Sequence, residues 1–168
     1  MTSKALFAAG CFWGVQYYFD EIPGVIKTTV GYTGGHTKNP TYEDVIGHHT
    51  GHAEALLVEY DSAKVQYSTL VRHFFRLHDP TALNAADGVN IGENYRSALY
   101  YFDDQQRQTA EKIREEVQAK YDEPIVTEFR PAGEFYPAED YHQKFTQRTG
   151  RGACHIDYAP LPEEKPST

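Results

Sequence analysis

The chain has 168 residues, a length that suits one domain with a sizeable core. Its 16 basic and 24 acidic residues give a formal net charge of −8, which argues against electrostatic binding to nucleic acid or to an anionic membrane surface. No apolar run is long enough to span a bilayer, and no apolar signal segment follows Met1–Lys4. We therefore expect a cytoplasmic protein whose two cysteines are thiols or form a transient catalytic disulfide.

The first predicted elements are a buried strand over residues 4–9 and a helix over residues 11–21. Cys11 then lies in the first turn of the helix, where free backbone amides and the helix dipole favour a thiolate. A lone cysteine in a strand-turn-helix is most often a small buried hydrophobe. The flanking Gly10 and Gly14 favour a functional thiol, because they leave room for a substrate to approach the backbone.

Phe12 and Trp13 follow this cysteine directly, and Trp13 is the only tryptophan of the chain. Two aromatic side chains beside a thiol can form a small apolar wall. Such a wall suits a methyl-bearing ligand better than a charged one.

Residues 25–32 are rich in β-branched side chains and predict a second strand. Thr41, with Asp44 three residues later, predicts a capped short helix that ends at Gly47. Three histidines lie within residues 48–52, but their spacing and the adjacent glycine favour a solvated loop over a metal site.

Residues 53–60 predict the clearest strand of the sequence. Its period of two places Glu54 on the same face as Leu56, Val58 and Tyr60. A carboxylate on an apolar face is desolvated, which raises its pKa and lets it hold a proton near neutral pH, as a general acid requires. The alternative is that Glu54 lies at the wet end of the strand or is paired with a cation.

The second half of the chain predicts a helix that stops at residues 79–80, a polar loop over 81–95 and a strand over 97–102. A helix capped at residues 103–104 and a short strand over 125–129 follow.

The second cysteine, Cys154, lies among glycines and arginines, which predicts a mobile, locally positive tail from about residue 145. We expect residues 1–154 to form a single domain that includes this tail, and the proline-containing residues 155–168 to be disordered.

Other site chemistries fit the residues less well. A hydrolase that uses Cys11 with a histidine and an asparagine lacks any local cysteine-protease signature. The glycines of residues 31–35 have neither the Walker lysine nor dinucleotide-binding spacing. We expect no metal and no cofactor.

Several motifs occur in order over residues 5 to about 145: Gly10–Gly14, Gly31–Gly35, Asn39–Tyr42, Thr50–Ala55, His78–Thr81, Tyr95–Ala98 and Phe135–Gln143. Together they closely resemble the A-type peptide methionine sulfoxide reductases. The resemblance implies an α+β fold, a two-layer α/β sandwich with a ferredoxin-like core and a mixed sheet. It also implies reduction of the S epimer of methionine sulfoxide, free or in proteins.

The same resemblance implies roles for single residues. Cys11 matches the nucleophile that attacks the sulfoxide sulfur, and Glu54 matches the acid that protonates the oxygen. Tyr42 and Tyr95 match hydroxyl donors that hold this oxygen. The aromatic pair after the cysteine, Phe12 and Trp13, matches the pocket for the substrate methyl group.

In the family a distal cysteine then attacks the sulfenic acid on the nucleophile, and thioredoxin reduces the resulting disulfide. Cys154 is the only other thiol here; if it does not reach Cys11, glutathione or glutaredoxin would take its place. Asn90 stands where the family usually has an aspartate that lies near the substrate, which removes a negative charge. The alternative is a module that binds methionine sulfoxide without turnover. We expect a monomer in either case.

Overall fold

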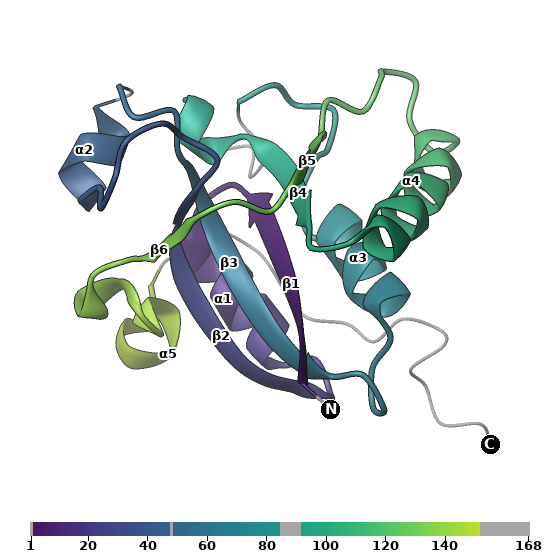
Figure 1. The fold of residues 1–168 in the computed structure, drawn as a ribbon, viewed down its shortest axis with the longest axis horizontal. Coiled ribbons are helices and arrows are strands. Elements are labelled where there is room, and N and C mark those ends of the chain that lie inside the picture. Colours follow the sequence, from purple (N-terminus) through teal and green to yellow (C-terminus); the bar gives the residue numbers. More distant parts are fainter. Residues whose placement is uncertain (1, 48, 85–91, 152–168) are drawn as a thin grey trace.

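A six-stranded mixed sheet runs through the protein, with its strands in the order β5-β4-β1-β3-β2-β6 (Figure 1). The computed structural model describes residues 2–47, 49–84 and 92–151. The strands are β1 (Thr2–Ala9), β2 (Val25–Thr33), β3 (Ala53–Asp61), β4 (Ser97–Tyr101), β5 (Glu128–Pro131) and β6 (Phe135–Pro137).

Five α-helices accompany the sheet in the described residues: α1 (Phe12–Asp20), α2 (Tyr42–Ile46), α3 (Tyr67–Arg76), α4 (Asp104–Gln118) and α5 (Phe145–Thr149). Short 3₁₀ turns lie at Glu93–Tyr95 and Asp140–His142. Helices α1 and α3 connect β1 to β2 and β3 to β4 in chain order, and α4 packs against α3.

The four central strands have a ferredoxin-like arrangement. Strand β1 pairs antiparallel with β3 and β4, and β2 pairs antiparallel with β3. Strand β5 adds parallel to β4, and β6 adds antiparallel to β2, so the sheet is mixed. The α+β class, the mixed sheet and the ferredoxin-like core implied by the resemblance are confirmed.

The main core lies between the sheet and its helices. Phe7 of β1 stacks on Phe19 of α1 and on Phe74 of α3, with ring centroids 5.4 and 5.0 Å apart. The opposite face of the sheet carries a smaller apolar cluster around Leu6 and Tyr100. Burying such aromatic rings supplies much of the apolar area that stabilises a domain of this size.

The topology brings four strand ends together. Because β1 and β2 both run antiparallel to β3, their carboxyl ends lie beside the amino ends of β3 and β4 (upper end of β1 in Figure 1). The segments that follow β1 and precede β4, together with the first residues of β3, therefore meet at one end of the sheet. Of the predicted site residues, those in the described part of the chain lie at this end of the sheet.

Local signals predicted most elements well. The capping box at α2 is present: Thr41 Oγ1 accepts from the Asp44 amide at 3.2 Å, and Asp44 Oδ2 accepts from the Thr41 amide at 2.9 Å. The strand predicted over 125–129 is displaced, because the Val126 amide donates to the Pro80 carbonyl at 2.8 Å and β5 begins only at Glu128.

Strand β6 and helix α5 were not predicted. Strand β6 has only three residues, too few for a pattern, and its approach to β2 depends on Gly31. A Cβ atom at Gly31 would lie 2.4 Å from the Tyr136 carbonyl oxygen. Helix α5 forms in the segment that was expected to begin the mobile tail. Residues from 152 onward lie outside the described part of the chain, so the division into one domain and a disordered end remains a prediction.

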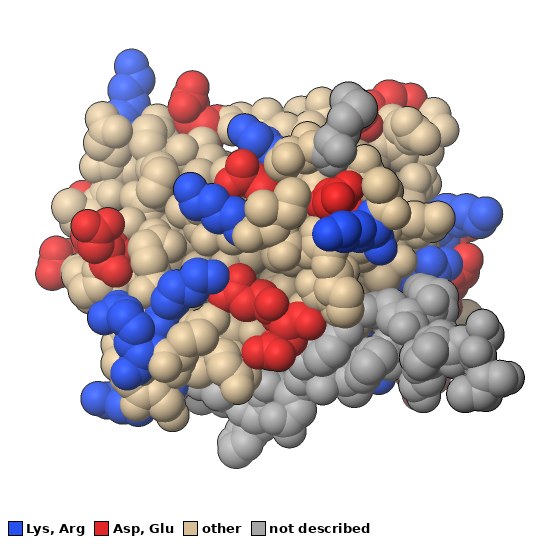
Figure 2. All heavy atoms as spheres, turned by 90° about the horizontal axis from the view of Figure 1, so that it is seen from below, with Lys and Arg blue, Asp and Glu red and all other residues tan. Residues whose placement is uncertain are grey.

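The surface seen from below carries basic and acidic side chains interspersed, as Figure 2 shows. In the described part of the chain, no helix combines the length and apolar character needed to cross a membrane.

His78, just beyond α3, is a buried histidine that joins separate parts of the fold. Its Nδ1–H donates to the Phe74 carbonyl at 2.6 Å, so its Nε2 accepts from the Ser97 hydroxyl at 2.7 Å. The Ser97 oxygen in turn lies 2.7 Å from Thr127 Oγ1. Burial lowers the pKa of His78 to about 4.

His78 should make the protein less stable in mild acid. In the unfolded chain its pKa is about 6.5, so stability that is present above that pH is lost as the pH falls toward 4. Between pH 7 and pH 5 we expect this to remove about 2 kcal/mol from the free energy of unfolding. Urea unfolding at both pH values measures the fall in the free energy of unfolding between pH 7 and pH 5. This fall should be smaller by about 2 kcal/mol in His78→Asn than in the unmodified protein, whereas the exposed control His36→Asn should show the same fall as the unmodified protein. Equal losses in His78→Asn and the unmodified protein would contradict this assignment.

Candidate active site

The turn between β1 and α1 presents the first cysteine. Gly10 has a φ of 92°, in the left-handed region that favours glycine, and it reverses the chain directly after β1. Cys11 is the N-cap residue of α1 and is 8% exposed. Cys11 therefore lies at the positive end of the helix, as predicted. The thiolate expected there from the dipole and the free amides remains a prediction.

Glu54 is a buried carboxylate beside this turn. It is the second residue of β3, is 2% exposed and pairs in register with Tyr32 of β2. Its Oε1 accepts from the Phe12 amide at 3.2 Å, and its Oε2 accepts from the Asn94 side-chain amide at 3.5 Å. The prediction that Glu54 lies on the buried face is confirmed, and its position at a wet strand end is excluded.

Tyr42 and Tyr95 come from different segments and meet at Glu54. Tyr42 begins α2 and Tyr95 ends a 3₁₀ turn, and the two phenols lie close enough to affect each other's pKa. Burial, and then the negative charge of Glu54, raises the pKa of both phenols; the nearby Cys11 adds to the rise in the pKa of Tyr42. Both side chains therefore keep their protons near neutral pH and can donate hydrogen bonds.

Phe12 and Trp13 differ in exposure. The Phe12 ring is buried and lies 5.7 Å from the Tyr32 ring, whereas Trp13 is only partly buried. The Trp13 ring stacks on Phe145 of α5 with centroids 4.0 Å apart. Its indole N–H donates to His142 Nδ1 at 2.9 Å. Both aromatic residues thus lie in the first turn of α1, directly after Cys11.

Three polar residues at this site received no role from the sequence: Asn94, Glu139 and His142. Glu139 accepts hydrogen bonds from the Tyr42 amide and the Tyr32 hydroxyl, both at 3.0 Å. Burial alone would raise the pKa of Glu139, but these hydrogen bonds lower it, so the group is a carboxylate. Glu139 and His142 lie within the motif Phe135–Gln143, so the family resemblance could have pointed to them. No local sequence pattern indicates that Asn94 is buried.

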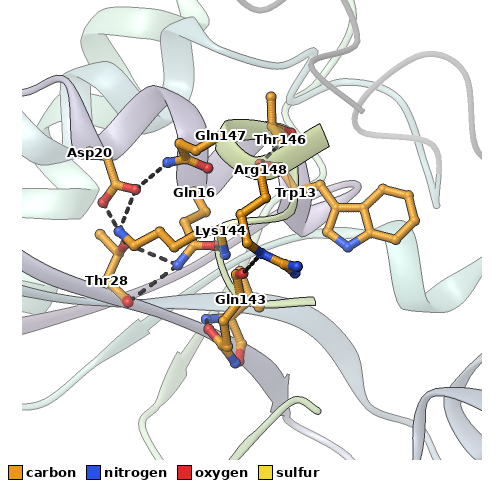
Figure 3. Close-up of polar contacts among 10 residues, drawn as sticks. Trp13, Gln16, Asp20, Thr28, Gln143, Lys144, Thr146, Gln147 and Arg148 are labelled. Atoms are coloured by element: carbon orange, nitrogen blue, oxygen red, sulfur yellow. Dashed lines mark hydrogen bonds and ion pairs between the residues drawn. The ribbon is translucent and has the colours of Figure 1, made fainter. Parts of the chain in front are cut away.

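The segment after His142 is held against α1 and β2 (Figure 3). The Gln143 side chain accepts from the Val30 amide at 3.0 Å and donates to the Val30 carbonyl at 2.9 Å, as a neighbouring strand would. Lys144 Nζ contacts Asp20 Oδ2 at 2.5 Å and Thr28 Oγ1 at 3.1 Å. These contacts fix the position of the segment that leads into α5.

The two remaining predicted site residues, Asn90 and Cys154, lie outside the described residues, so their roles remain predictions. Within the described ranges, no group of His, Cys, Asp and Glu side chains is arranged to hold a metal ion. His52 is structural, because its Nδ1 accepts from the Gly35 amide at 3.0 Å and its Nε2–H donates to the Thr37 carbonyl at 2.8 Å.

Comparison with known proteins identifies the family. Residues 3–167 match the family model described as peptide methionine sulfoxide reductase. The peptide methionine sulfoxide reductase MsrA of Methanothermobacter thermautotrophicus is 46% identical over 155 residues, which cover 91% of each chain.

Solved structures agree with this match. Methionine sulfoxide reductase A of Corynebacterium diphtheriae is 33% identical, with a TM-score of 0.81 over 99% of this chain and 84% of that one. Mxr1 from Saccharomyces cerevisiae in complex with Trx2 is 29% identical, with a TM-score of 0.62 over 86% of this chain and 84% of that one. The family model and the close relative show that the chain belongs to the peptide methionine sulfoxide reductases.

Proposed function

We propose that this enzyme reduces the S epimer of methionine sulfoxide, free and in proteins, with Cys11 as nucleophile and Glu54 as acid. The observation that carries the proposal is the hydrogen bond from the Phe12 amide to the buried Glu54 carboxylate. It ties the acid to the first turn of α1, immediately beside the thiol. Tyr42 and Tyr95 add two protonated hydroxyl groups next to the same carboxylate.

The chemistry needs a nucleophile and an acid together. A sulfoxide oxygen is a poor leaving group until it is protonated, so the reaction uses Glu54 in its protonated form. Glu54 gives its proton to the oxygen as the Cys11 thiolate attacks the sulfoxide sulfur, and Glu54 is left as the carboxylate. The oxygen atom ends on Cys11 as a sulfenic acid, and methionine leaves as the reduced thioether. Cys11 supplies the two electrons, and Tyr42 and Tyr95 stabilise the oxygen by donating hydrogen bonds to it. Phe12 and Trp13 hold the substrate methyl group.

Recycling of the sulfenic acid is assigned to the second cysteine. The Cys154 thiol attacks the Cys11 sulfur, a disulfide forms and water leaves. A thioredoxin dithiol then reduces the disulfide; the structure of a yeast relative with Trx2 supports this partner. Glutathione or glutaredoxin serves instead if Cys154 does not reach Cys11. This cycle needs a reducing compartment such as the cytoplasm and no resident cofactor. We propose that the enzyme works as a monomer.

Replacing Glu54 by glutamine should lower kcat by a factor on the order of 10²–10⁴, because the amide has no proton to donate to the sulfoxide oxygen. The measurement is steady-state reduction of methionine S-sulfoxide with dithiothreitol, which bypasses thioredoxin. Glu59→Gln, on the same strand, is the matched control and should keep full activity. Full activity in Glu54→Gln would remove Glu54 from the mechanism.

Tyr42→Phe and Tyr95→Phe should each lower kcat by roughly tenfold, since each deletes one hydrogen bond to the sulfoxide oxygen.

Because the pKa of both phenols lies above its ordinary value, phenol ionisation should not reduce kcat as the pH rises toward about 10. Tyr17→Phe, on the outer part of α1, is the control. An alkaline limb near pH 9 that both replacements abolish would show that the phenols ionise during turnover.

A further inference from the structure

Asn94 is a fully buried amide that contacts the proposed acid. Its Nδ2–H donates to Glu54 Oε2 at 3.5 Å. Within the described residues its Oδ1 has no hydrogen-bond partner. A buried polar atom without a partner is costly, so an apolar side chain of the same shape would serve stability at this position at least as well. Packing and stability alone therefore do not account for an amide here.

The fold ties Asn94 to the strand that carries Glu54. Asn94 is the middle residue of a 3₁₀ turn, and Arg96 follows this turn directly. The Arg96 guanidinium donates to the Glu93 carbonyl at 2.8 Å and to the Gly51 carbonyl at 3.0 Å. Gly51 lies just before β3, so one side chain joins the turn to the start of this strand. The amide is thus positioned before any substrate binds.

Glu54 is subject to opposing influences. Its burial favours the neutral acid, and a thiolate at the nearby Cys11 acts in the same direction. The Phe12 amide on Oε1 and the Asn94 amide on Oε2 favour the carboxylate. The other titratable groups of the described chain that the charge of Glu54 reaches are phenols that burial keeps protonated: Tyr32, Tyr42 and Tyr95.

We propose that Asn94 is a positioning residue for the acid step and that its amide determines how readily Glu54 releases its proton. When the proton passes to the sulfoxide oxygen, Glu54 is left as a carboxylate. The hydrogen bond from Asn94 then strengthens, because its acceptor has become charged. The proposal rests on the function proposed above, and Asn94 acts on the substrate only through Glu54.

Two substitutions remove the donor but keep the size of the side chain. Asn94→Leu cannot hydrogen-bond, and Asn94→Asp offers an acceptor and a second negative charge in place of the donor. The control is Gln106→Leu, which deletes a different buried amide. Gln106 Nε2 donates to the Lys4 carbonyl at 2.9 Å, near the amino end of β1 and thus at the other end of the sheet.

The first readout is the titration of Glu54 itself in the full chain, without substrate. The ¹³C chemical shift of its labelled carboxyl group follows its protonation, and Glu54→Gln identifies the signal by its loss. We expect the pKa of Glu54 to be higher in Asn94→Leu than in the unmodified enzyme by about one pH unit, a tenfold change in the acid dissociation constant. Asn94→Asp should raise it at least as much, and Gln106→Leu should leave it unchanged.

The second readout is the rate of methionine formation in a single turnover with methionine S-sulfoxide, measured from pH 5 to pH 9. In Asn94→Leu the acid keeps its proton to higher pH. The ratio of the rate of this variant to that of the unmodified enzyme should therefore rise by up to about tenfold as the pH passes the pKa of Glu54. A purely structural role would change the rate by the same factor at every pH.

An unchanged or lower pKa of Glu54 in Asn94→Leu, or a rate ratio that does not depend on pH, would overturn the role of Asn94. If the unmodified enzyme formed no methionine, the proposed function would fail instead. The titration of Glu54 would then decide by itself whether Asn94 controls its proton.

Discussion

The buried carboxylate of Glu54 is the constraint on which the site depends. Placing a carboxyl group in an apolar interior is unfavourable unless hydrogen-bond donors reach it, and here the Phe12 amide and the Asn94 side chain do so. These donors belong to segments that follow β1 and precede β4. The ferredoxin-like order, in which β1 lies between β3 and β4, brings all three segments together. The same contact that satisfies Glu54 therefore also places this carboxyl group beside the first turn of α1, next to Cys11.

The C-terminal part of the described chain completes this arrangement from the other side. His142 accepts a hydrogen bond from the Trp13 indole, and the ring of Phe145 stacks on the same indole. The indole is therefore held by the segment that leads toward the second cysteine in the sequence. Gln143 anchors that segment by acting as a strand partner to Val30. The surroundings of Trp13 and the position of the segment that leads into α5 thus depend on one set of contacts.

Features with a local signal could be predicted from the sequence, and features that depend on topology could not. The period of two around Glu54 and the capping box at Thr41 are contained within a few residues, and both predictions were correct. The hydrogen bond between Trp13 and His142 joins residues 129 positions apart, so no local sequence pattern could predict it. Strand β6 exists only because Gly31 lets it approach β2. The family resemblance supplied the roles of Tyr42 and Tyr95, which local chemistry alone would not have singled out.

The most direct test of the account is the intact mass of Cys154→Ser after one turnover with methionine S-sulfoxide and no reductant. Without the second thiol, the sulfenic acid on Cys11 has no internal partner and should accumulate. The account predicts one methionine per chain, one added oxygen atom, and dimedone labelling at Cys11. Methionine formed without oxygen on Cys11, or with oxygen on another residue, would contradict direct oxygen transfer to this thiol.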